Sequence, residues 1–160
     1  MPSPRLLAAA LAGAALGLVA CNQDTVATRC RPVPTPSPPV ATAGQLTATT
    51  DAGIVPTGGA IDASVKVAGP LSYQAPCDGP LSLIVIDRTD IHVDSLAPPA
   101  LKGTPCGAVT LAAGQSAEYD VLWSSDPSLP PGPYRLVLSL GDQPQLVLSV
   151  RLGYEVQTCR

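Results

Sequence analysis

Phenylalanine is absent from this chain, and charged residues are scarce. Of its 160 residues only 13% are charged, two are glutamate and one is histidine. Helical bundles and coiled coils are rich in Ala, Glu, Lys and Leu at heptad spacing, so this composition argues against both. The sequence pI is about 4.8 and no cluster of Lys or Arg occurs, which argues against a nucleic-acid partner. A metal centre built on several histidines is excluded, because His92 is the only one.

The chain also lacks an apolar run long enough to cross a bilayer as a helix, which takes about 20 residues. Its longest run, residues 6–20, contains only Leu, Ala, Gly and Val and follows the basic residue Arg5. An apolar segment of this length behind a positive charge is typical of a signal peptide. We therefore expect residues 1–20 to be a signal peptide that is removed on export.

The apolar run ends in Leu18-Val19-Ala20-Cys21. This tetrapeptide resembles the lipobox of bacterial lipoproteins. The resemblance implies cleavage before Cys21, a diacylglycerol on its thiol and an acyl chain such as palmitate on its amine. Two or three acyl chains hold a protein stably on a membrane. We expect a lipid-anchored protein of the bacterial cell envelope, with the membrane leaflet left open; an ordinary secretory signal is the alternative, and both imply export.

Four cysteines remain after Cys21, and no CxxC pair is among them. An even number of cysteines in an exported chain predicts two disulfides rather than a zinc site. Three pairings are possible. We favour Cys77–Cys106, which flank the middle of the predicted domain, and Cys30–Cys159, which would join its two ends.

Residues 21–44 follow as a polar segment with Pro32-Val33-Pro34-Thr35-Pro36-Ser37-Pro38-Pro39 at its centre. Proline fixes φ and removes backbone donors, so this segment favours an extended polyproline II conformation. We expect a semi-rigid linker between the lipidated Cys21 and the domain. A ligand for a proline-binding module is the alternative.

Residues 45–160 alternate short apolar runs with Gly and Pro. Several runs have period 2; Ala117, Tyr119, Val121 and Trp123, for example, share one face. Such alternation predicts antiparallel sheets with one solvated face. The fold class is therefore all-β, an immunoglobulin-like β-sandwich of about 7–9 strands. The expected strands are 46–50, 61–68, 71–74, 81–87, 91–93, 108–111, 117–123, 134–140 and 145–152.

One part of this domain resembles a known family. Val109–Tyr119, Trp123 and Leu129-Pro130-Pro131-Gly132-Pro133-Tyr134 resemble the C-terminal half of the intracellular proteinase inhibitor (BsuPI-like) family, and Leu81–Arg88 resembles its apolar strand. The resemblance covers residues 61–140 and is sharpest over 114–134. It implies an immunoglobulin-like fold and protease inhibition, but no inhibitory residue can be matched. The chain departs from the family in its predicted export and its extra strand 145–152.

Trp123 and Tyr134 are the aromatic residues of the sharpest part of that resemblance. Pro130 and Pro131 hold the chain extended, Gly132 permits a turn, and Tyr134 then begins a strand, which predicts a tyrosine corner. We expect Trp123 and Tyr134 to be structural core residues. An aromatic ligand platform is the other interpretation.

Residues that could carry chemistry are few. Asp90, His92 and Asp94 are spaced i, i+2, i+4 and would share one face of a strand, where they could bind a divalent metal. A solvated strand face explains the same pattern. A serine hydrolase would need a GxSxG nucleophile elbow, which is absent. We therefore predict no catalytic residue, no cofactor and no metal site beyond this weak candidate.

Three functions remain open. The first is a membrane-anchored, non-catalytic binding or interaction module, whose partner is an unknown envelope protein. The second is a BsuPI-like protease inhibitor, whose partner would be a protease. The third is a metal-binding envelope protein that uses Asp90, His92 and Asp94. The lipobox, the linker and the strand pattern favour the first.

Overall fold

The computed structural model describes residues 36–153, which form eleven strands and no helix. The predicted signal peptide 1–20, Cys21 and the predicted Cys30–Cys159 pair lie outside this range. Within it, no helix long and apolar enough to cross a membrane is found. The strands are β1 (Val40–Ala43), β2 (Leu46–Thr50), β3 (Ile54–Val55), β4 (Ala60–Ala68), β5 (Leu71–Ala75), β6 (Leu81–Asp87), β7 (His92–Leu96), β8 (Gly107–Leu111), β9 (Ser116–Ser124), β10 (Gly132–Leu140) and β11 (Leu146–Leu152).

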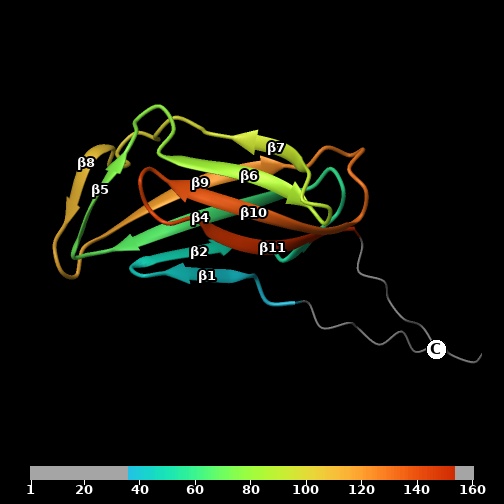
Figure 1. The fold of residues 1–160 in the computed structure, drawn as a ribbon, viewed down its shortest axis with the longest axis horizontal. Helices are drawn as coiled ribbons and strands as arrows, with labels where there is room; N and C mark the ends of the chain where they lie inside the picture. Colours follow the sequence, from blue (N-terminus) through green and yellow to red (C-terminus); the bar gives the residue numbers. More distant parts are fainter. Residues whose placement is uncertain (1–35, 154–160) are drawn as a thin grey trace, which may run out of the picture.

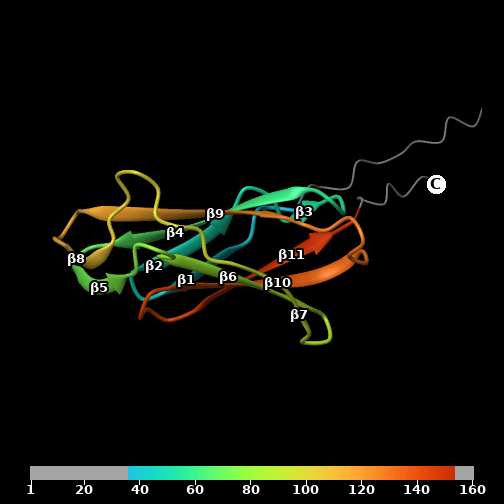
Figure 2. The ribbon, with the colours of Figure 1, turned by 90° about the horizontal axis from the view of Figure 1, so that it is seen from above.

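Nine of these strands form two sheets that pack face to face. One sheet has the order β1-β2-β4-β9 and the other β3-β11-β10-β6-β7. All neighbours pair antiparallel except β3 and β11, which pair parallel. Figure 2 shows the two layers edge-on, and the buried hydrophobic cluster is made of residues from both. The prediction of an all-β, immunoglobulin-like sandwich is confirmed.

Alternating side chains build this core, as the period-2 pattern predicts. In β9 the buried residues are Ala117, Tyr119, Val121 and Trp123, and the residues between them are exposed. β11 repeats the alternation along its whole length. Because each inward side chain meets the facing sheet, the two strands contribute eight buried residues to one hydrophobic cluster.

The described chain begins and ends at the same end of the sandwich. Pro36 and Ser37 lie against Gly53. The backbone carbonyl of Gly53 in turn accepts a hydrogen bond from the backbone N–H of Arg151, close to the end of β11. Figure 1 shows both ends on the right of the molecule. We call this the entry end.

The opposite end is a two-stranded ribbon, β5 and β8. The β4–β9 ladder stops at Ala68 and Ser116, and the chain turns a corner before β5 and β8 pair. Gly69 occupies this corner because a Cβ there would lie 2.1 Å from the carbonyl oxygen of Ala112. A disulfide closes the far side of the ribbon. It joins Cys77 and Cys106, so that predicted pairing is confirmed.

All nine predicted strands correspond to observed ones, and two strands were not predicted. β3 is only two residues long, and β1 lies inside the predicted linker, residues 21–44. The sheet therefore begins at Val40 rather than after residue 44. β7 begins at His92 rather than Ile91 and continues to Leu96. This shift matters for the predicted metal ligands.

Candidate functional site

Trp123 and Tyr134 are both buried in the core. Trp123 has no exposed surface and Tyr134 is 3% exposed. Their ring centroids are 6.5 Å apart, and the Tyr134 hydroxyl donates a 2.8 Å hydrogen bond to the carbonyl oxygen of Pro130. This is the geometry of a tyrosine corner at the start of β10. Both rings act as core residues, as predicted, and neither offers a face to a ligand.

Asp94 has a structural role that the sequence did not indicate. One of its carboxylate oxygens accepts a 2.8 Å hydrogen bond from Nε1 of Trp123, and the other accepts one from the backbone N–H of Ser95. The bond to Trp123 links β7 to β9 across the two sheets. The local sequence pattern could not predict this hydrogen bond, because the two residues lie 29 positions apart.

The structure does not bring Asp90, His92 and Asp94, the weak candidate for a metal site, together as ligands. Asp90 lies in the turn before β7 with a φ of 64°, and its carboxylate pairs with Arg135. The Asp94 carboxylate is taken by Trp123 and Ser95. Within residues 36–153 no group of three or more His, Cys, Asp and Glu residues is placed to hold a metal ion. The turn at Asp90 is the physical reason, since it removes the first ligand from the strand.

The outer surface of β2, β4 and β9 carries most of its charge as carboxylates; we call it the acidic face. A hollow of about 300 Å³ opens there. Partial burial, followed by the charges of Asp120 and Asp51, raises the pKa of Asp62. The pKa of Asp120 is raised by partial burial and by the charge of Glu118. The hollow is lined by Thr49, Thr50, Asp51, Asp62, Ser64, Glu118 and Asp120.

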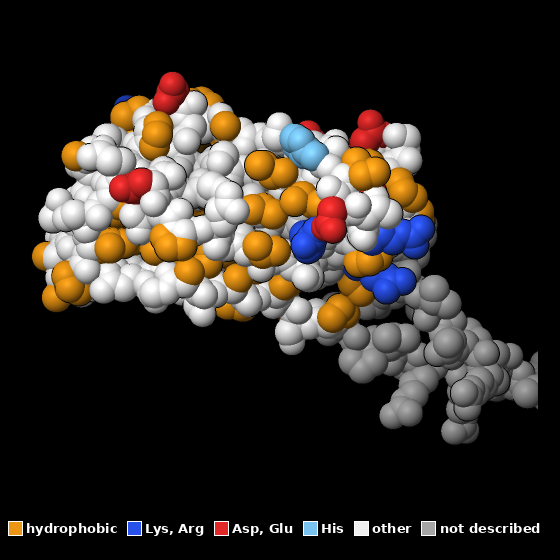
Figure 3. Space-filling model, viewed as in Figure 1, with side chains coloured by type: hydrophobic (Ala, Val, Ile, Leu, Met, Phe, Trp, Pro, Cys, Tyr) orange, Lys and Arg blue, Asp and Glu red, His pale blue; other side chains and the backbone are white. Residues whose placement is uncertain are grey.

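The outer surface of β6, β10 and β11 is different, and we call it the arginine face. Arg135 projects from β10, and Arg151 from β11 stands opposite Pro133. Arg88 follows β6 directly and lines a hollow of about 40 Å³ with Pro133. Beyond Arg135 along β10, on the side away from the entry end, lies an apolar row in which Val137 is flanked by Ile84 and Val147. Figure 3 views this face and shows basic and hydrophobic side chains together toward the entry end.

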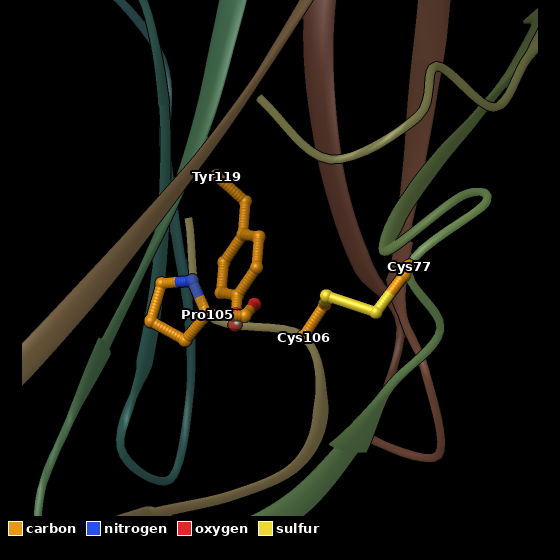
Figure 4. Close-up of a disulfide and its surroundings, with 4 residues drawn as sticks. All are labelled: Cys77, Pro105, Cys106 and Tyr119. Atoms are coloured by element: carbon orange, nitrogen blue, oxygen red, sulfur yellow. Dashed lines mark hydrogen bonds between the residues drawn. A yellow bond between two sulfur atoms is a disulfide. The ribbon is translucent and has the colours of Figure 1, made fainter. Parts of the chain in front are cut away.

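The ribbon end presents a loop, residues 97–106, between β7 and β8. The Tyr119 hydroxyl donates a 2.9 Å hydrogen bond to the carbonyl oxygen of Pro105 in this loop, beside the disulfide (Figure 4). That hydroxyl also lies 2.7 Å from the Tyr73 hydroxyl. Burial and the hydrogen bond with Tyr73 raise the Tyr119 pKa. Leu101, at the tip of the loop, is 68% exposed.

Comparison with known proteins adds little about function. No protein-family model and no curated protein sequence matches the chain. Among solved structures, the sporulation control protein Spo0M from Bacillus subtilis is similar with a TM-score of 0.45 and 10% identity over 71% of this chain and 51% of that one. The alkylpurine DNA glycosylase AlkC of Pseudomonas fluorescens gives a TM-score of 0.42 and 11% identity over 71% and 32%. The chain thus spans about half of the first structure and about a third of the second, and neither similarity assigns a function.

Proposed function

We propose that the chain is an exported lipoprotein whose sandwich is a non-catalytic binding module, held on a bacterial membrane through Cys21. The sequence Leu18-Val19-Ala20-Cys21 behind the apolar run 6–20 is the observation that carries this proposal. The position of the entry end supports it. A linker from Cys21 would reach the sandwich at Pro36, at one end of the molecule, which leaves the outer face of β2, β4 and β9 free.

The acidic face is the binding surface that we propose for a protein partner. Asp62 and Asp120 have pKa values raised by partial burial and by neighbouring acids. Their charges therefore repel one another in the free protein, and a cationic group seated in the hollow would relieve that repulsion. Complementary charge across an interface mainly raises specificity and the rate of association. The expected partner is a basic protein segment of the cell envelope.

Two measurements test the proposal. Mass spectrometry of the protein made in a bacterial host should find an N-terminal acylated cysteine and no residues 1–20, and Cys21→Ser should abolish both features. An intact, unmodified N-terminus would refute the anchor. In pull-downs from envelope extract, Asp120→Asn should lose a partner that Asp78→Asn, an exposed acid near the ribbon end, retains. Equal recovery by both variants would refute the acidic face as the binding surface.

A second candidate, protease inhibition, is favoured by the loop 97–106. Inhibitory loops need an exposed side chain on a conformation that is fixed before binding. Here Leu101 is exposed, while the backbone N–H of Ala100 donates to the Cys77 carbonyl and the disulfide holds the end of the loop at Cys106. The mature chain should then inhibit at least one member of a protease panel, and Leu101→Ala should weaken that inhibition. Full protease activity at molar excess of the chain would eliminate this candidate.

A further inference from the structure

The basic residues of the sandwich are distributed unevenly. All three arginines of the described range, Arg88, Arg135 and Arg151, lie on the arginine face toward the entry end. The two lysines of that range lie elsewhere. Lys66 is on the acidic face opposite Glu118, and Lys102 is in the loop of the ribbon end. The sandwich therefore has one face that is basic and another that is acidic.

Apolar side chains accompany the arginines. Val137, Ile84 and Val147 form a cross-strand row on the same outer surface; Val147 is 48% exposed, Ile84 is half-buried, and Val137 between them is only 9% exposed. Ile91 is 60% exposed in the turn after β6, where its backbone carbonyl accepts a hydrogen bond from the backbone N–H of Asp87. Arginine heads beside apolar groups suit the boundary between lipid headgroups and acyl chains, where each type of group finds its preferred surroundings.

Two acids lie close to this surface, and only one of them forms an ion pair. Asp90 pairs with Arg135, the only ion pair within residues 36–153. Asp87 accepts hydrogen bonds from the backbone N–H groups of Thr89 and Ile91, which keep its carboxylate ionised, and it lines the same hollow as Arg88. Arg88 and Arg151 have no carboxylate partner in the described part of the chain. These two arginines are therefore the groups that can meet an external anion.

The length of chain before the sandwich allows this face to reach a membrane. Fifteen residues lead from Cys21 to Pro36, and a fully extended segment of that length spans about 50 Å. The nine residues of β10 span about 30 Å. A sandwich anchored at Cys21 can therefore lie with its arginine face on the lipid surface instead of standing on its entry end.

We propose that the arginine face docks on anionic phospholipid headgroups of the membrane that holds Cys21. This inference rests on the proposed function, because the anchor supplies the membrane at high local concentration. Arg88 and Arg151 bind headgroup phosphates, and the exposed side chains of Val147 and Ile91 lie at the acyl boundary. The acidic face is then turned away from the negative surface and is free for a protein partner.

The test uses the processed chain, residues 21–160, with Cys21→Ser, which contains the whole sandwich and no acyl group. Its cosedimentation is measured with vesicles of equimolar phosphatidylglycerol and phosphatidylcholine and with vesicles of phosphatidylcholine alone. Each arginine near an anionic surface contributes about fivefold in binding, so Arg88→Gln with Arg151→Gln should weaken binding to the anionic vesicles roughly 25-fold. The control pair, Lys66→Gln with Lys102→Gln, removes the same charge and should change binding by less than about twofold.

Equal loss of binding in the arginine and lysine pairs would overturn the docking face, since net charge alone would then explain it. Equal binding of the unaltered chain to both kinds of vesicle would overturn it as well. Because this chain carries no acyl group, the vesicle result is independent of the proposed anchor. If the chain binds anionic vesicles but the protein made in cells is not acylated, the lipid anchor is refuted and docking through the arginine face is still supported. If the protein is acylated in cells but the chain does not prefer anionic vesicles, the anchor is supported and the docking face is refuted. Circular dichroism of each variant checks that the sandwich is intact.

Discussion

Buried aromatic residues of the sandwich direct their polar atoms to acceptors on other elements. Trp123 donates to Asp94 on β7, Tyr134 to Pro130 before β10, and Tyr119 to Pro105 in the ribbon-end loop. A buried donor without a partner costs about 1–3 kcal/mol, and among the described residues no buried side-chain polar atom is left unpaired. These bonds fix the loops and the edge strand β7 to the two sheets.

The Trp123–Asp94 bond can be tested directly because the chain has one tryptophan. Asp94→Ala removes the acceptor and should lower the free energy of unfolding by roughly 1–3 kcal/mol. Asp94→Asn keeps an oxygen acceptor and should lose less. Urea unfolding followed by Trp123 fluorescence measures both variants. An Asp94→Ala variant as stable as the unaltered chain would show that the bond contributes nothing.

At the scale of elements, alternating hydrophobicity allowed nine strands to be predicted, because each of them faces the core on one side and solvent on the other. It could not predict β1 and β3, which have four and two residues and are held by backbone pairing with β2 and β11. It also could not place Asp90, whose positive φ belongs to the turn before β7. The arginine face was missed for a related reason: its residues come together only through the register of β10 and β11 and the position of Arg88 after β6.

The hairpin between β10 and β11 supports the ribbon through Gly141. This residue has a φ of 51°, and a Cβ there would lie 1.6 Å from the carbonyl oxygen of Gln74 in β5. Gly44 has a similar φ of 59° and open space around it, which makes it the control. Both Ala variants carry the cost of the left-handed conformation, about 1–2 kcal/mol. Gly141→Ala should be clearly less stable than Gly44→Ala in denaturant unfolding, since β5 must also move. Equal losses of unfolding free energy in the two variants would mean that the close approach of Gly141 to Gln74 does not affect stability.

The disulfide acts on the ribbon end as a unit. Cys77 and Cys106 are separated by 29 positions, and closing a loop of that size stabilises the fold by about 3.5 kcal/mol in the chain-entropy model. Cys77→Ser with Cys106→Ser should therefore lower the unfolding free energy by up to about that amount. Hydrogen exchange should increase first in β5 and β8. Unchanged exchange in these strands would contradict a role for the disulfide in holding the ribbon.

Over the whole molecule, the two outer faces of the sandwich differ in charge and in the way that their acids are held. On the acidic face, Asp62 and Asp120 have raised pKa values because of burial and neighbouring carboxylates. Elsewhere, hydrogen bonds lower the pKa of acids in turns: the side chain of Thr89 for Asp87, the backbone of Ser128 for Asp126 and the side chain of Gln143 for Asp142. The acidic face is therefore the part of the molecule where negative charge opposes folding. A basic partner or a lower pH would reduce this repulsion and stabilise the fold.

This contrast predicts opposite effects of removing one carboxylate from each class. The folded chain holds the Asp120 proton more tightly than the unfolded chain, because burial and the charge of Glu118 raise its pKa above 3.8. Its contribution to stability therefore falls as the pH rises through the folded pKa, and Asp120→Asn should raise the Tm at neutral pH. The gain should vanish well below 3.8, where the carboxyl is protonated in both states. For Asp126 the hydrogen bonds from Ser128 lower the pKa, so Asp126→Asn should lower the Tm at neutral pH, and its effect should fade once acid protonates the folded carboxyl. Scanning calorimetry across this pH range measures both variants. If the two Tm values shift in the same direction at neutral pH, the charge of Asp120 does not destabilise the acidic face as proposed.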